Sequence, residues 1–127
     1  MQTMRTPLKN VRRLGSAKEG SDHFWKQRVS AVALLVLGTV VVALIVSLVG
    51  ADHATAKRTL ANPLVSLVLM LLIGAGVIHM RLGMQVIIED YIRGEGSKIV
   101  LLMLNTFFAI AVGVACTLAV LKLSFGA

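Results

Sequence analysis

Three long apolar runs separated by short polar stretches dominate the pattern of residues along this chain. The first covers residues 29–50, carries no charged side chain, and would form a helix about 33 Å long at 1.5 Å per residue. The second and third cover residues 64–90 and 99–121. The hydrocarbon core of a bilayer is about 30 Å thick, so each run is long enough to cross it. The pattern predicts an all-α integral membrane protein with three transmembrane helices at about 29–50, 64–90 and 99–121.

The stretches between the runs are short and polar. Residues 51–62 separate the first two runs, and Pro63 then favours the first turn of a new helix. Residues 93–98 contain two glycines within three positions, which indicates a turn between the second and third helices. We therefore expect an N-terminal arm over residues 1–28 and one membrane domain over residues 29–127.

Composition excludes the other broad classes for a chain of this length. Hydrophobic residues make up 57% of the 127 residues and charged residues 15%, whereas a soluble domain carries roughly 25% charged residues. A disordered chain would be poor in apolar residues. The single cysteine excludes a disulfide-stabilised secreted scaffold.

The formal net charge of +7 is best explained by membrane topology. Of the 13 basic residues, seven lie in the first 28 positions and two, Arg93 and Lys98, follow the second run. Lys57, Arg58 and Lys122 lie on the opposite side. The positive-inside rule then predicts a cytoplasmic N-terminus and a C-terminus outside. Because topology accounts for most of the basic excess, the charge does not indicate a nucleic-acid partner.

Ionisable residues inside a span are costly and suggest function, and His79 is the first candidate. It lies about 15 residues into the second run. A neutral imidazole can ligate haem iron, but it can equally form a hydrogen bond with a neighbouring helix. Gly83 follows one turn later on the same face, where it leaves room either for a flat macrocycle or for close approach of another helix.

Arg81 lies about 200° around the helix from His79, so it cannot point the same way. It could extend towards the membrane surface, face another subunit or meet an acidic group, and we favour contact with a partner. Asn105, in the third run, is expected to form a hydrogen bond between helices.

Polar residues also gather at the predicted cytoplasmic side of the membrane. Asp90 lies within about 20° of the His79 face, and Tyr91 lies about 18 Å along the helix axis from His79. Tyr91 is either an interfacial anchor or a hydroxyl donor to a carbonyl group, with Asp90 holding or relaying a proton. Arg28 immediately precedes the first run. It is either a topology signal or a residue that binds a carboxylate.

Together these residues resemble a known family. The stretch from His79 to Tyr91 is similar to the H-x3-G-x6-D-Y signature of succinate dehydrogenase hydrophobic membrane anchor subunits of the proteobacterial type. The stretch HFWKQRVS at residues 23–30 resembles the beginning of that family's first helix. The resemblance covers nearly the whole chain.

The resemblance implies a role within respiratory complex II in the bacterial cytoplasmic membrane. His79 would supply one axial ligand to haem b, the haem iron being the metal. Arg28 would lie near the haem propionates and the quinone pocket. Tyr91 would bind ubiquinone, the substrate, and Asp90 would belong to the quinone surroundings.

The implied partners are a second membrane anchor (the cytochrome b556 subunit), an iron–sulfur subunit and a flavoprotein subunit, together with membrane lipid. The chain would have no activity alone. Two alternatives remain open from the sequence. One is the anchor of a quinol:fumarate reductase, and the other is a structural three-helix membrane protein without redox function.

Overall fold

The computed structural model describes residues 6–8 and 19–126, and within them it is helical without strands. Its helices are α2 (Glu19–Ser47), α3 (His53–Leu60), α4 (Pro63–Tyr91) and α5 (Glu95–Ser124). The three long helices are each sufficiently long and apolar to cross a membrane. The three predicted spans are therefore confirmed.

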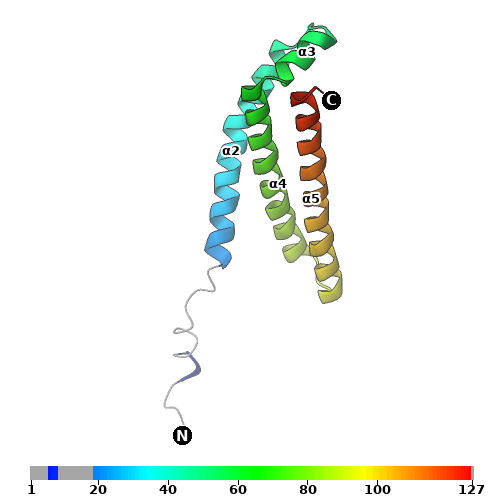
Figure 1. Cartoon of the computed structure of the whole chain (residues 1–127). Helices are drawn as coiled ribbons and strands as arrows, with labels where there is room; N and C mark the ends of the chain where they lie inside the picture. The colour runs from blue at the N-terminus through cyan, green and yellow to red at the C-terminus, as the bar shows by residue number, and fades with distance from the viewer. Residues whose placement is uncertain (1–5, 9–18, 127) are drawn as a thin grey trace.

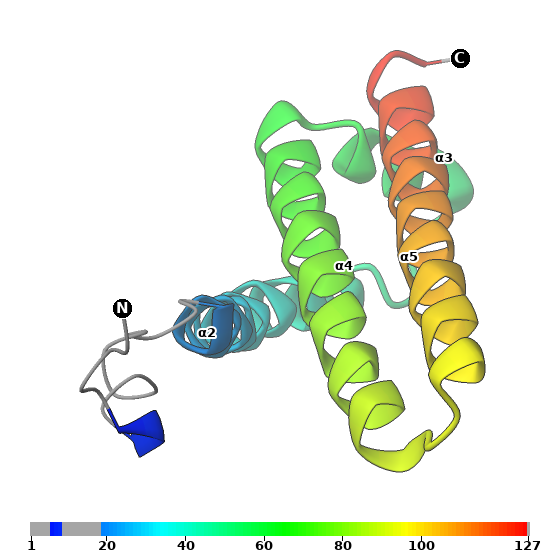
Figure 2. The same cartoon turned by 90° about the horizontal axis from the view of Figure 1, so that it is seen from below.

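Helix α4 lies at the centre of the arrangement. It packs against α2 on one side and α5 on the other, and α2 and α5 make no contact with each other (Figures 1 and 2). The beginning of α2, the end of α4 and the beginning of α5 lie at one end of the molecule, whereas α3 and the end of α5 lie at the other (Figure 1). The polar residues at the beginning of α2 therefore share an end with Tyr91, as the predicted topology requires.

The first long helix begins and ends earlier than its apolar run. It starts at Glu19 and ends at Ser47, whereas the predicted span covers residues 29–50. A helix can continue beyond the hydrocarbon because its backbone hydrogen bonds are internal, so polar side chains there remain helical. Beyond its other end the chain turns over residues 48–50, where Gly50 has a φ of 81°, a left-handed conformation that glycine readily adopts.

The other boundaries follow local capping. Helix α4 begins at Pro63, as predicted, and Asn62 caps it by accepting a hydrogen bond of 2.9 Å from the backbone N–H of Leu64. Helix α5 begins at Glu95, so the turn is shorter than the predicted 93–98 and Gly96 is helical. A carboxylate in the first turn is favourable because it faces the positive end of the helix dipole. Helix α3, within the predicted polar loop, was not expected.

Small and polar residues bring the long helices together. A Cβ atom on Gly113 of α5 would lie 3.4 Å from Val77 Cγ2 of α4, and one on Gly76 of α4 would lie 3.7 Å from Leu34 Cδ2 of α2. The hydroxyl oxygens of Ser66 and Ser124 lie 2.7 Å apart. Such contacts are typical of helices that associate in a membrane, where close packing replaces the hydrophobic effect.

Most large apolar side chains point outward. Leu35, Ile45, Phe107 and Phe108 are all exposed in the isolated chain, and few of the residues that the structure describes are buried. Exposure of this kind suits a helix surface that faces lipid or another membrane subunit. The structure is thus a thin layer of three helices with little interior of its own.

Candidate functional site

His79 is held by the first long helix. Its imidazole is half-buried, and Nδ1 lies 3.1 Å from the hydroxyl oxygen of Ser30 on α2. Ser30 itself is buried, with 6% of its surface exposed. Within residues 6–8 and 19–126, no hydrogen bond engages His79 Nε2. The neighbouring helix therefore uses one ring nitrogen and leaves the other available.

A polar face of α2 continues from Ser30 towards the beginning of the helix. His23, Gln27 and Ser30 follow one another at spacings of four and three residues, so they lie on one face. The Nε2 atom of His23 and the Oε1 atom of Gln27 are buried and lack hydrogen-bond partners in the part of the chain that the structure describes. Buried polar atoms normally have partners, so these two indicate a water, a ligand or a partner subunit at this end.

Gly83 lies opposite this polar face. A Cβ atom at Gly83 would lie 3.6 Å from Gln27 Nε2, an ordinary van der Waals contact. Of the two sequence-based interpretations, close approach of another helix is therefore the one that the structure supports. Because that contact would be an ordinary one, α2 lies beside Gly83 without depending on the absence of its side chain.

Arg28 points away from this face. Its guanidinium carbon lies 4.9 Å from the centre of the Phe24 ring, a cation–π arrangement. Phe24 in turn meets Trp25 edge-on, with ring centroids 6.1 Å apart. An arginine supported by aromatic rings at the end of a span suits the membrane surface. Its predicted role near haem propionates stays a prediction.

Asp90 and Tyr91 lie at the end of α4 and are both exposed, Tyr91 with 79% of its surface. Beside them, Gln85 Nε2 donates to Glu89 Oε1 over 2.9 Å. No hydrogen bond or ion pair among the described residues joins any two of His79, Arg28, Asp90 and Tyr91. In the isolated chain, His79 lies near the middle of the bundle and the other three lie towards one end. The chain alone does not form a closed site around these four residues.

Arg81 faces α5. Its Nε donates to the Thr106 hydroxyl over 3.4 Å, and its backbone carbonyl accepts a hydrogen bond of 2.9 Å from Asn105 Nδ2. The predicted hydrogen bond of Asn105 between helices is confirmed. Arg81 thus contacts α5, whereas His79 contacts Ser30 on α2. The Arg81 side chain nevertheless remains exposed.

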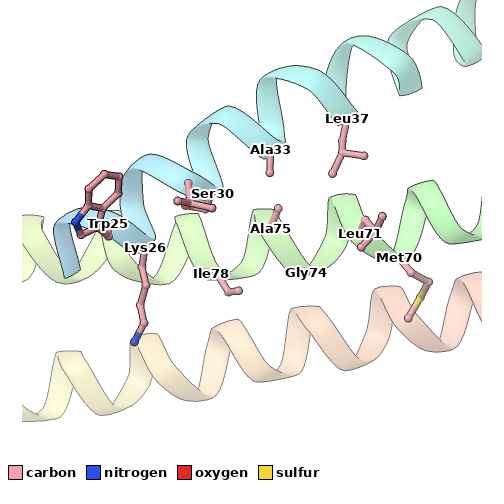
Figure 3. A pocket seen from close by; sticks show the side chains of 11 residues that line it. Trp25, Lys26, Ser30, Ala33, Leu37, Met70, Leu71, Gly74, Ala75 and Ile78 are labelled. Carbon is pink, nitrogen blue, oxygen red and sulfur yellow. The ribbon is translucent and has the colours of Figure 1, made fainter. Parts of the chain in front are cut away.

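An apolar groove of about 730 Å³ runs between α2 and α4 (Figure 3). Ala33 and Leu37 line it from α2, and Gly74, Ala75 and Ile78 from α4. Trp25 and Lys26 lie at one end, where Lys26 pairs with Asp22 over 2.6 Å. Ser30 also lines the groove, so the groove extends to the residue of α2 that contacts His79.

His79 fits the role of a single haem ligand supplied by one chain. Among residues 6–8 and 19–126, no cluster of three or more His, Cys, Asp or Glu side chains could hold a metal ion. An axial ligand requires only one imidazole from a chain. His79 meets that requirement because its Nδ1 is hydrogen-bonded while its Nε2 is not, the usual arrangement for a metal-binding histidine.

Sequence reasoning missed His23, Gln27 and Ser30 as a set. All three were within the stretch compared with the family, but no role was assigned to them. Their spacing on one helical face was a signal that could have found them. This signal was missed because the predicted helix began at residue 29, which lies after His23 and Gln27.

The fold and these contacts define a multi-pass α-helical membrane protein with a histidine held in the middle of its central span. The family model of the succinate dehydrogenase/fumarate reductase transmembrane subunit matches residues 2–120. The chain belongs to that family.

Two curated relatives are similar over almost their whole lengths. The succinate dehydrogenase hydrophobic membrane anchor subunit of Paracoccus denitrificans is 31% identical over 122 residues, which is 96% of this chain and 94% of the relative. The subunit of the same name from Rickettsia bellii is 29% identical over 116 residues, 91% of this chain and 93% of the relative. No solved structure matches. The resemblance to the anchor family is therefore confirmed.

Proposed function

We propose that this chain is the membrane anchor subunit of a succinate:ubiquinone oxidoreductase in the bacterial cytoplasmic membrane. The observation that carries the proposal is His79, in the central span, with Nδ1 hydrogen-bonded to Ser30 and Nε2 unengaged within the described residues. The chain's family membership supports an anchor role, although the family includes subunits of both succinate dehydrogenase and fumarate reductase. Only the names of its two curated relatives favour succinate oxidation over fumarate reduction.

On this proposal, each candidate residue has a distinct task. His79 would hold haem b through Nε2, and the haem would supply one-electron redox chemistry when bound. Tyr91 donates its hydroxyl to a ubiquinone carbonyl about 18 Å along the helix axis from His79. Asp90 holds a proton in the same surroundings, and Arg28 offers a guanidinium to carboxylates nearby.

The same proposal requires partner chains. One imidazole on a thin three-helix layer cannot enclose a macrocycle, so a second anchor, the cytochrome b556 subunit, would supply the other ligand. The iron–sulfur and flavoprotein subunits would dock at the cytoplasmic side, where the beginning of α2 and the end of α4 meet the membrane surface. The exposed apolar faces of the isolated chain leave room for such contacts.

Co-purification tests this assignment directly. A tagged chain extracted from its native membrane in mild detergent is expected to bring down a second three-helix subunit, an iron–sulfur protein and a flavoprotein. The untagged strain provides the control. Recovery of the chain free of redox subunits would favour a structural membrane protein without redox function.

The proposed orientation has its own test. With Cys116 replaced by alanine, new cysteines are introduced singly as Ser97→Cys and Ala54→Cys, at two exposed positions on opposite ends of the bundle. A membrane-impermeant maleimide is expected to label the Ser97→Cys protein in inverted vesicles and the Ala54→Cys protein in spheroplasts. The reverse pattern would place the N-terminus outside and contradict the positive-inside prediction.

A further inference from the structure

Ser30 makes two contacts through a single hydroxyl group. Its oxygen lies 3.0 Å from the backbone carbonyl oxygen of Gln27 and 3.1 Å from His79 Nδ1. A serine hydroxyl carries only one proton, so it can donate to one of these atoms and must accept from, or repel, the other.

The Gln27 carbonyl decides which contact receives the proton. A carbonyl oxygen only accepts hydrogen bonds, so two oxygen atoms 3.0 Å apart need a proton between them. Were the hydroxyl to donate to His79 instead, oxygen lone pairs would face each other at this distance in a buried position. Donation from Ser30 to Gln27 avoids that repulsion and matches the common bond from a helical serine to the preceding turn.

We infer that Ser30 is a positioning residue that selects the tautomer of His79 with the proton on Nδ1. With its own proton committed to Gln27, the Ser30 oxygen accepts from His79 Nδ1–H. Nε2 then carries the lone pair that a metal ligand needs. The backbone carbonyl of Gln27 in α2 thus sets the direction of both hydrogen bonds. The inference rests on the proposed role of His79.

The Ser30 contact also affects how strongly His79 can bind a metal and how its ring is oriented. A hydrogen bond from the distal ring nitrogen to an acceptor raises the basicity of the imidazole and fixes the ring plane. A more basic imidazole stabilises ferric over ferrous iron, so it lowers the midpoint potential. Ser30 is buried, so water cannot readily replace its hydroxyl as the acceptor.

Three variants of the assembled complex test this inference. Ser30→Ala is expected to shift the haem midpoint potential to more positive values and to change the low-spin electron paramagnetic resonance signal, which reports the orientation of the axial ligand planes. Ser30→Thr keeps a hydroxyl and is expected to restore both properties. Ser47→Ala is the matched control, because Ser47 makes the same bond to the preceding turn of α2, at 2.6 Å to Leu44, away from His79.

An unchanged potential and signal in Ser30→Ala would overturn the inference, as would a shift that Ser30→Thr fails to reverse. A similar shift in Ser47→Ala would also overturn it. The failure of the proposed function is distinguishable, because in that case the chain would be recovered without redox subunits or His79→Ala would leave the haem spectrum intact. If the Ser30→Ala complex is normal and the His79→Ala complex is altered, the role of Ser30 is rejected and the proposed role of His79 is kept.

Discussion

Replacing His79 by alanine is expected to lower the amplitude of the low-spin haem signal of the purified complex by more than about tenfold. Even loss of an outer partner of a metal ligand commonly lowers metal affinity by about 10–100-fold, and this change removes the ligand itself. Ligation by the second anchor alone would leave an altered, high-spin spectrum. Optical difference spectra and electron paramagnetic resonance of the complex measure the effect.

A second substitution separates ligation from helix packing. In the structure His79 also joins α4 to α2 through Ser30, so alanine removes a structural contact as well. His79→Gln keeps a side-chain amide that can hydrogen-bond with the Ser30 hydroxyl, but an amide is a poor ligand for haem iron. We expect the same spectral loss in His79→Gln with the subunits still assembled.

The control for both variants is His53→Ala, which changes an exposed histidine in α3 outside the three spans. It is expected to leave spectrum and assembly unchanged. A His79→Gln complex with a wild-type haem spectrum would show that His79 serves only to hold α4 against α2. That result would support the structural interpretation considered from the sequence.

The sequence was sufficient to predict features that depend on local chemistry. The three spans follow from the length and apolarity of their runs, and the beginning of α4 follows from Pro63. Asn105 was expected to bond between helices because an amide inside a span needs a partner. The structure supplies that partner, the Arg81 carbonyl.

Features that depend on the register between helices could not be predicted in the same way. Ser30 and His79 are 49 positions apart, and nothing local to either residue indicates their contact. The beginning of α2 at Glu19 was missed because an apolar run shows where the hydrocarbon lies, not where the helix starts. The contact of Arg81 with Thr106 was not expected because the face of α4 that packs on α5 was unknown from the sequence, and the favoured contact with a partner stays a prediction.

Tyr91→Phe is expected to lower quinone reductase activity by roughly tenfold, which corresponds to about 1.4 kcal/mol and is typical of one lost hydrogen bond to a reacting group. The change removes only the hydroxyl and keeps the ring at the membrane surface. Tyr91 is 79% exposed at the last residue of α4, so removal of its hydroxyl should not disturb the packing of the helices. Succinate oxidation with an artificial dye acceptor should remain near the wild-type rate, because that reaction bypasses the quinone site.

The control distinguishes this role from that of an interfacial anchor. Phe125 is another exposed aromatic residue, with 81% of its surface exposed, immediately after α5 at the opposite end of the bundle. Phe125→Leu should leave quinone and dye activities unchanged. If the ring of Tyr91 matters only as an anchor, Tyr91→Phe will also retain full quinone activity, since phenylalanine preserves the apolar ring. A parallel loss of dye activity would instead indicate faulty docking of the soluble subunits, so only the selective loss of quinone reduction supports a hydroxyl that binds ubiquinone.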